Sequence, residues 1–265
     1  RGSVRLGPGG VGYERMSCPT MLIAGWADGY RNNTFRVVEQ YDRNGLPWRL
    51  LAGPWVHKSP ATGRPGPNVD DDVEIIAFFD QHLRGGPGAA SAPAQVYVRR
   101  PVAPEPDLAF HPGVWRDLTT WPPTGLFWLT LRPDVTDGRI DEIVARGDVG
   151  VAAWNSCGGG LPWGQPLDQR EDDARSLTYD WPIDEQLDSP AELLGSARVE
   201  LRVRPDQAYG HVGVKLCDVF PDGTSALIAR GMLDLTHAGC WPADPGGEVG
   251  RRPAPLRPGE WMAIE

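Results

Sequence analysis

Two short, continuous apolar runs separated by an amphipathic segment constrain the fold of this chain more than any other feature of its sequence. The runs occupy residues 20–24 and 48–52 and are bounded by Pro and Gly. Such runs are typical of strands buried on both faces of a parallel sheet. Between them, Phe35, Val38 and Tyr41 fall on one face of a helix. The pattern predicts a βαβ unit, with the helix as the crossover between two parallel strands.

A second helix is predicted over residues 70–85. Three aspartates at positions 70–72 stand where the helix dipole favours negative charge, and Arg84 with Gly85 provides a basic last turn and a glycine stop. The apolar residues of this segment also follow helical spacing; they are Val73, Ile76, Phe79 and Leu83.

From about residue 94 the periodicity changes from helical to alternating. Alternation predicts half-buried antiparallel strands at 95–99 and 198–204, a hairpin of 211–219 with 226–235, and a further strand at 125–131. The sequence Pro221-Asp222-Gly223 supplies the hairpin turn. We therefore expect an α/β part over residues 1–93, followed by an all-β sandwich of jelly-roll type over residues 94–265.

Charge and cysteine content narrow the classes of partner. The net charge is −9; residues 1–100 carry 12 basic and 9 acidic groups, and the remainder carries 14 basic and 26 acidic groups. The chain has no dense stripe of Lys and Arg, so nucleic acid and anionic membranes are poor partners. Its longest apolar runs are also well short of the roughly 20 residues that span a bilayer. The four cysteines lack metal-ligand spacing, so we expect no metal or cofactor and a cytoplasmic protein.

An acid and a histidine follow the two early strands. Asp28 lies in the loop after the first strand and His57 lies in the loop after the second. The carboxyl ends of neighbouring parallel strands share one edge of a sheet, so these side chains can meet there. An Asp that orients a His is the pair needed to take a proton from a hydroxyl nucleophile. Read without context, one Asp and one His in turns are more often structural than catalytic.

No nucleophile completes this pair. In α/β-hydrolases the chain order is Ser, then Asp or Glu, then His. None of the nine serines lies in a G-x-S-x-G motif, and only Ser3 and Ser17 precede Asp28. Cys157 is followed by three glycines, a context that favours a flexible loop over a catalytic thiol.

Six short motifs, all in one order, carry a resemblance to a known family. They are Gly25-Trp26-Ala27-Asp28, Gly53-Pro54-Trp55-Val56-His57, the helix end Phe78-Phe79-Asp80-Gln81-His82-Leu83-Arg84-Gly85, Trp115-Arg116 with Trp121-Pro122, Ser176-Leu177-Thr178-Tyr179, and Asp218-Val219-Phe220-Pro221-Asp222-Gly223. This series resembles the CocE/NonD hydrolases, the group of cocaine esterase and X-Pro dipeptidyl-peptidase.

The resemblance implies the C-terminal part of an α/β-hydrolase domain followed by a jelly roll. It implies that Asp28 is the triad acid, His57 the triad base and Tyr30 an aromatic residue of the acyl pocket. In this family the nucleophile elbow lies upstream of the first strand seen here. Because the chain begins with Arg1 and residues 261–265 resemble a strand cut midway, we expect a piece of a longer hydrolase, inactive when isolated.

The expected substrate is a small ester or an amide such as an X-Pro peptide, and the sequence is compatible with a homodimer. The alternative is a non-catalytic β-sandwich module that binds carbohydrate or protein, for which the aromatic content provides a reason. Aromatic side chains mostly fill cores, however. The other histidines, at positions 82, 111, 211 and 237, are interpreted as surface or hydrogen-bonded residues, and residues 168–173 as a solvated acidic loop.

Overall fold

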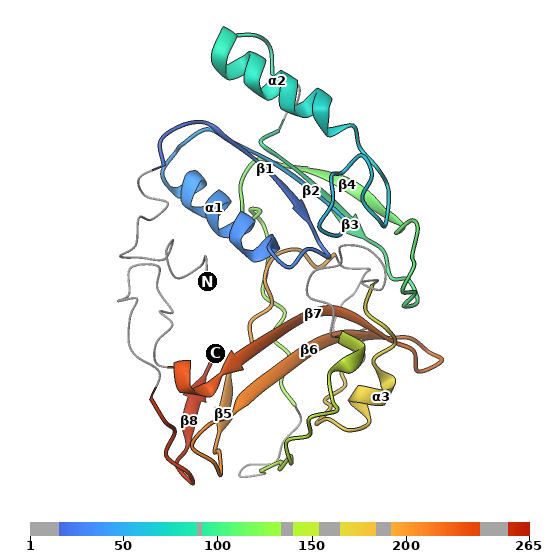
Figure 1. The fold of residues 1–265 in the computed structure, drawn as a ribbon, viewed down its shortest axis with the longest axis vertical. Helices are drawn as coiled ribbons and strands as arrows, with labels where there is room; N and C mark the ends of the chain where they lie inside the picture. Colours follow the sequence, from blue (N-terminus) through green and yellow to red (C-terminus); the bar gives the residue numbers. More distant parts are fainter. Residues whose placement is uncertain (1–15, 89–91, 134–139, 154–164, 184–191, 239–253) are drawn as a thin grey trace.

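The computed structural model describes residues 16–88, 92–133, 140–153, 165–183, 192–238 and 254–265 (Figure 1). The elements of the first half are β1 (Thr20–Gly25), α1 (Arg31–Arg43), β2 (Trp48–Gly53), α2 (Asp71–Arg84), β3 (Ala94–Arg99) and β4 (Gly113–Leu118). Those of the second half are η2 (Val151–Ala153), α3 (Arg170–Asp173), β5 (Leu201–Val203), β6 (His211–Val219), β7 (Ser225–Asp234), η3 (Leu235–His237) and β8 (Met262–Ile264).

The predicted βαβ unit is confirmed. Strands β1 and β2 pair in parallel from Thr20 opposite Trp48 to Gly25 opposite Gly53, and α1 connects them. Helix α1 buries Val37, Val38 and Tyr41. These positions lie on one face of the helix, so the apolar spacing in the sequence specifies the side of α1 that packs.

The first sheet extends beyond this unit in the order β1-β2-β3-β4. Strand β3 is antiparallel to β4, as its alternation predicts, but it is also parallel to β2 and is more buried than a half-exposed strand. Strands β3 and β4 therefore share a sheet with β1 and β2. The domain boundary after residue 93 stays a prediction.

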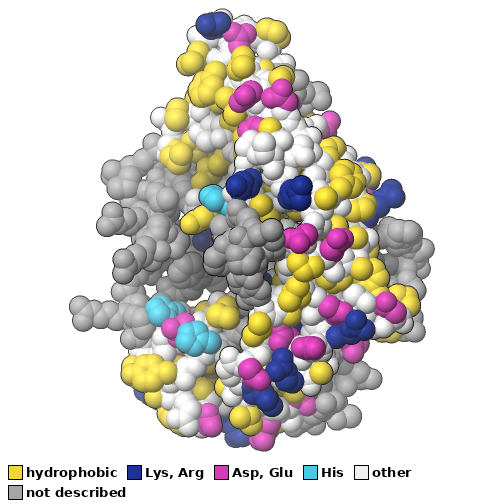
Figure 2. Space-filling model, turned by 45° about the vertical axis from the view of Figure 1, so that its right-hand side comes forward, with side chains coloured by type: hydrophobic (Ala, Val, Ile, Leu, Met, Phe, Trp, Pro, Cys, Tyr) yellow, Lys and Arg dark blue, Asp and Glu magenta, His cyan; other side chains and the backbone are white. Residues whose placement is uncertain are grey.

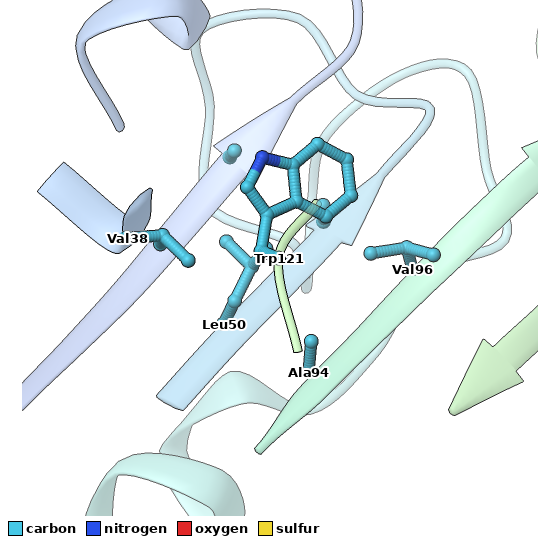
Figure 3. Packing of buried hydrophobic residues seen from close by; sticks show 7 residues of the cluster. Val38, Leu50, Ala94, Val96 and Trp121 are labelled. Atoms are coloured by element: carbon cyan, nitrogen blue, oxygen red, sulfur yellow. The ribbon is translucent and has the colours of Figure 1, made fainter. Parts of the chain in front are cut away.

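The principal core lies between α1 and this sheet (Figure 3). It contains small and branched side chains from the strands, and the indole of Trp121 closes it. Its buried members are Ala24, Val38, Leu50, Ala52, Ala94, Val96 and Trp121. Burial of this apolar area is the main contribution to the stability of the sheet.

Helix α2 forms as the sequence predicts. The side chain of Asp70 accepts a hydrogen bond from the backbone N–H of Asp72, and Gly85 ends the helix in the left-handed conformation, with φ of 69°. Its apolar residues are nevertheless exposed: Ile76 has 67% of its surface accessible, and only Phe78 is buried. Helix α2 lies at the end of the molecule farthest from β5 and β8, and hydrophobic side chains are visible on that end (Figures 1 and 2).

The C-terminal strands form two pairs. Strands β6 and β7 make the predicted antiparallel hairpin, and Gly223 in its turn has φ of 83°. Strands β5 and β8 pair antiparallel over three residues each. Two of the predicted strands differ from those in the structure. Residues 125–131 form no strand, and the strand expected at 198–204 is limited to Leu201–Val203. Alternation alone does not make a strand where no neighbour offers a hydrogen-bonding edge.

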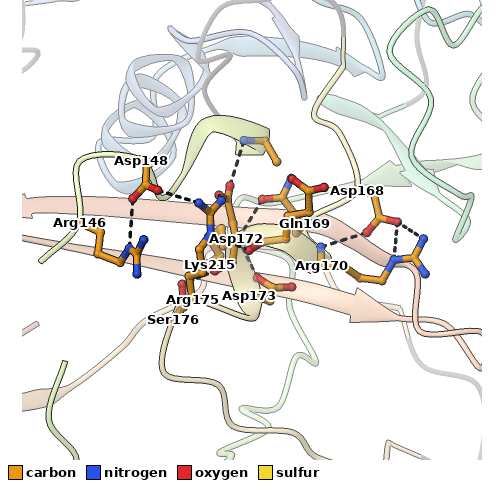
Figure 4. A network of polar contacts seen from close by, with 12 residues as sticks. Arg146, Asp148, Asp168, Gln169, Arg170, Asp172, Asp173, Arg175, Ser176 and Lys215 are labelled. Atoms are coloured by element: carbon orange, nitrogen blue, oxygen red, sulfur yellow. Dashed lines mark hydrogen bonds and ion pairs between the residues drawn. The ribbon is translucent and has the colours of Figure 1, made fainter. Parts of the chain in front are cut away.

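The acidic segment at 168–173 is not the solvated loop expected from its composition. Gln169 and Asp172 are buried, and their polar atoms are bonded to neighbouring groups (Figure 4). Asp173 accepts from Ser225 Oγ at 2.7 Å and pairs with Lys215 Nζ at 2.7 Å. Contacts with residues about 50 positions away in the sequence thus compensate for the burial of these polar groups.

The carboxyl ends of β1, β2 and β3 and the start of α1 all point toward the hairpin β6–β7 (Figure 1). The loops after these strands therefore lie between the first sheet and the C-terminal strands. Over the described ranges, no helix is both long and apolar enough to span a membrane.

Candidate active site at the carboxyl ends of β1 and β2

The loops that follow β1 and β2 are hydrogen-bonded to each other. The backbone N–H of Trp26 donates to the carbonyl of Gly53 at 2.9 Å, and that of Ala27 donates to the carbonyl of Trp55 at 3.1 Å. A Cβ at Gly25 would clash with the Trp55 carbonyl, so this close approach requires glycine. The backbone thus fixes the separation of the two loops before any side chain contributes.

These loops bring Asp28 and His57 together. Asp28 Oδ2 lies 2.9 Å from His57 Nδ1, and Asp28 Oδ1 accepts the backbone N–H of Tyr30 at 2.8 Å. An ionised carboxylate only accepts hydrogen bonds, so Nδ1 must carry the hydrogen and, in the neutral ring, Nε2 is left as the acceptor. In the described part of the chain Nε2 has no hydrogen-bond partner, and 57% of the His57 side chain is exposed.

Arg31 hydrogen-bonds to the backbone of the loop that carries Asp28, a contact that the sequence does not predict. Its Nη1 donates to the carbonyl of Trp26 at 3.0 Å and to that of Asp28 at 3.4 Å. The only signal in the sequence is a basic residue three positions after the acid, at the start of a helix. The loop carrying Asp28 is therefore restrained by both backbone and side-chain contacts.

Tyr30 lies beside the histidine. The two ring centroids are 5.2 Å apart with planes inclined by 55°, and Tyr30 is largely exposed. This position agrees with an aromatic residue that borders the space in front of His57. Its role in an acyl pocket stays a prediction.

No nucleophile accompanies this pair within the ranges that the structure describes. No serine or cysteine there is hydrogen-bonded to His57, and Ser59, two residues later, donates instead to Asp71 Oδ1 at 3.0 Å. Cys157 lies outside the described residues.

The remaining histidines make local contacts. The ring of His82 packs on Phe78, and His111 is buried with Nδ1 3.0 Å from the carbonyl of Pro112. Burial lowers the pKa of His111. His211 and His237 both face Asp234, at 3.7 and 3.2 Å.

Among the described residues, no group of three or more His, Cys, Asp or Glu side chains is arranged to hold a metal ion. Acidic and basic side chains alternate over the described C-terminal part of the face shown in Figure 2.

Comparison with known proteins gives two family matches that together extend over most of the chain. Residues 10–59, which include Asp28 and His57, match the X-Pro dipeptidyl-peptidase (S15 family) model. Residues 88–265 match the model of the X-Pro dipeptidyl-peptidase C-terminal non-catalytic domain.

Three relatives extend this result. A Mycobacterium bovis protein whose name describes a serine esterase is 30% identical over 81% of this chain and 35% of its own length. Cocaine esterase from a Rhodococcus species is 26% identical over 85% of this chain and 43% of its own. A Streptomyces avermitilis protein named for Xaa-Pro dipeptidyl-peptidase activity is 29% identical over 78% and 29%.

The chain thus spans less than half the length of these curated relatives. The family matches imply an α/β-hydrolase part followed by a C-terminal β-sandwich. On the strength of these matches, and in agreement with the motifs in its sequence, the chain belongs to the CocE/NonD family, the group of cocaine esterase and X-Pro dipeptidyl-peptidase.

Proposed function

We propose that this chain is the part of a serine hydrolase that supplies the acid and the base of a Ser-His-Asp triad. The observation that carries the proposal is the 2.9 Å contact of Asp28 Oδ2 with His57 Nδ1, together with a His57 side chain that is 57% exposed. The names of the relatives, which describe esterases and a dipeptidyl-peptidase, support this reaction class.

The chemistry follows from the geometry. A serine hydroxyl placed near Nε2 transfers its proton to His57 while its oxygen attacks an ester or amide carbonyl. Asp28 keeps the hydrogen on Nδ1 and stabilises the imidazolium that forms. His57 then donates the proton to the leaving alcohol or amine, and water releases the acyl group by the same route.

The serine in this proposal lies outside the chain, in a longer polypeptide that contains it. The substrate is a small ester or an X-Pro amide, and Tyr30 borders its acyl group. The C-terminal part in this scheme is a jelly roll that packs beside the site. The alternative of a purely binding module gives no reason for two loops that fix an acid against a histidine.

The test compares the 265-residue chain with a longer polypeptide that contains it. Both are assayed with nitrophenyl acetate and a Gly-Pro chromogenic amide. The longer protein should turn over one of them, and its His57→Ala and Asp28→Asn variants should each lose about 10⁴-fold in kcat, as triad substitutions do in unrelated serine proteases. His82→Ala, on the exposed helix α2, is the matched control and should retain full activity.

Two results would overturn parts of this proposal. Turnover retained by His57→Ala in the longer protein would remove His57 from the mechanism. Turnover by the 265-residue chain itself, abolished by His57→Ala, would show that the nucleophile lies within these residues.

A further inference from the structure

The loop that carries Asp28 is anchored in the core at its start. There Trp26 stacks on Phe35 with ring centroids 5.2 Å apart, and its Nε1 donates to the carbonyl of Tyr97 at 2.6 Å. At the end of the loop, by contrast, Tyr30 is 65% exposed. Exposed residues contribute little packing, so the position of the acid depends on the polar contacts of its loop.

Arg31 joins this loop to its anchored residue. Its Nη1 donates to the carbonyl of Trp26 at 3.0 Å and to that of Asp28 at 3.4 Å, and its backbone N–H reaches the same Asp28 carbonyl at 3.4 Å. The first of these bonds has ordinary length, and the two others are long. A guanidinium group carries five N–H donors in a fixed plane, so one group can bridge two carbonyls. Arg31 therefore connects the peptide of the acid to a residue that the core fixes.

The place of Arg31 in α1 is unfavourable for the helix itself. Arg31 is the first residue of α1, where the positive end of the helix dipole disfavours a cation, and the first turn contains no acidic residue. Burial lowers the pKa of Arg31, and the charge of Asp28 offsets part of this effect. A cation that is partly withdrawn from water at such a position needs compensating contacts, and the two carbonyls provide them.

The charge of Arg31 does not compete with His57 for the acid. Asp28 uses Oδ2 for His57 Nδ1 and Oδ1 for the backbone N–H of Tyr30. Over the ranges that the structure describes, Arg31 contacts the acid through its backbone carbonyl and forms no ion pair with its carboxylate. Attraction between the opposite charges therefore adds to the hydrogen bonds of the loop, and both carboxylate oxygens keep their partners.

We propose that Arg31 is a positioning residue of the triad, which holds the Asp28 loop so that the carboxylate stays 2.9 Å from His57 Nδ1. This inference rests on the proposed function, because Arg31 acts only through the acid and the base. Misplacement of a reacting group by about 1 Å costs on the order of 100-fold in rate. Release of this loop is therefore expected to impair proton transfer without changing the contacts of the substrate.

The longer polypeptide that contains the chain tests this role by its kinetics. Arg31→Met removes the donors and the charge and keeps an unbranched apolar stem. It should lower kcat by about 100-fold and leave KM nearly unchanged, because the lost interaction positions the acid and does not bind substrate. Arg31→Lys returns a charged donor on a shorter stem without the planar fork, so its kcat should lie between those of Arg31→Met and the parent.

Arg43→Met is the matched control, because Arg43 lies at the other end of α1 and forms an exposed ion pair with Glu39. Such pairs contribute little, so this variant should keep the kcat of the parent. Circular dichroism checks that each variant is folded. If Arg31→Met does not fold, Arg31→Gln, which keeps an amide donor without the charge, gives the same comparison.

The tautomer of His57 in the 265-residue chain gives a readout that needs no turnover. Nitrogen-15 NMR of the neutral ring should show the hydrogen on Nδ1 in the parent, because Asp28 accepts it. Arg31→Met should give a mixture of the two tautomers, and Arg31→Lys should shift it back toward the parent. Asp28→Asn provides the reference for complete loss of the carboxylate.

The two measurements separate failure of this inference from failure of the proposed function. Parent-like kcat in Arg31→Met, an equal loss in Arg43→Met, or a His57 tautomer that Arg31→Met leaves unchanged would overturn the role of Arg31 while the triad stands. If the longer protein keeps its turnover after His57→Ala, the proposed function fails. The tautomer of His57 then still decides whether Arg31 holds the acid against the histidine.

Discussion

The central strands β2 and β3 of the first sheet bury most of their apolar side chains, whereas the hairpin β6–β7 buries none of its own completely and is attached to its neighbours by polar contacts. In the described part of the chain, the only buried hydrophobic residues after Trp121 are Ala153, Leu235 and Ile264. The C-terminal region instead buries polar groups that are paired, among them Gln169, Asp172 and Ser225.

This difference shows that one chain can stabilise two regions in two ways. Apolar contacts are numerous and non-directional, so their loss scales with the volume removed. The stability of a buried polar network depends on every partner, because a buried group that loses its partner is desolvated without a compensating hydrogen bond. Three predictions test this comparison.

The largest effect is expected in the apolar core. Leu50 is fully buried between α1 and the neighbouring strands. Leu50→Ala should lower the free energy of unfolding by about 3 kcal/mol through lost burial and the cavity that remains. Ile76→Ala, on the exposed face of α2, is the control and should change it by less than about 0.5 kcal/mol. Denaturant unfolding measures both, and equal effects would mean that the core is elsewhere.

A smaller effect is expected in the polar network. Asp172 Oδ2 accepts the backbone N–H of Ala152 at 2.9 Å, and Asp172 Oδ1 pairs with Arg175 at 3.2 Å. Asp172→Ala leaves the N–H without its partner and should cost about 2 kcal/mol. The exposed neighbour substitution Glu171→Ala is the control.

Hydrogen exchange shows which region of the molecule each substitution destabilises. Asp172→Ala should accelerate exchange in α3, β6 and β7 more than in β1–β3, and Leu50→Ala should do the reverse. The same pattern in both variants would mean that the two regions unfold as one unit and that the comparison does not hold.

The smallest effect is expected in the stability of the fold at low pH. The carboxylates whose pKa is lowered, within the described ranges, all follow residue 100 and are Asp148, Asp168, Glu192, Asp222 and Asp234. The hydrogen bond from Arg116 lowers the pKa of Glu192, and the backbone N–H of Thr224 lowers that of Asp222. Burial alone raises the pKa of Asp168, but hydrogen bonds from Arg170 and Ser225 outweigh it.

A carboxylate with a lowered folded-state pKa stabilises the fold above its unfolded pKa of about 4, and this contribution is lost as the pH falls through the folded value. The C-terminal region should therefore lose structure at a higher pH than the first sheet. Each group is exposed enough for salt to screen it, so each contribution is small. Acid titration followed by NMR checks this order, and Asp168→Asn should reduce the pH dependence. Earlier loss of β1–β3 would contradict it.

The two helices show what the spacing of apolar residues can predict and what it cannot. The sequences of α1 and α2 both predict an apolar face, and both helices form, because the spacing of apolar residues and, in α2, the Asp70 cap act locally. Only α1 buries its face against the sheet. Whether an apolar face is covered depends on what else the chain places beside it, and spacing carries no information about that.

The candidate site likewise has a part that the sequence predicts and a part that it does not. Residue types and order placed Asp28 and His57 in the loops after adjacent parallel strands, and the prediction that they can meet follows from topology. The 2.9 Å contact itself depends on the inter-loop hydrogen bonds and the close approach at Gly25. The prediction that the acidic segment 168–173 is solvated is wrong, because its partners, Lys215 and Ser225, are distant in sequence.

The sequence by itself determined the βαβ unit, the two helices, the hairpin and the family motifs, because these depend on residues within about 30 positions of one another. The tertiary structure alone decided that β3 joins the first sheet, that residues 125–131 form no strand, and that the acidic segment 168–173 pairs with Lys215 and Ser225. These outcomes depend on which distant edges and charges meet, and pairings of that kind are fixed only when the whole chain packs.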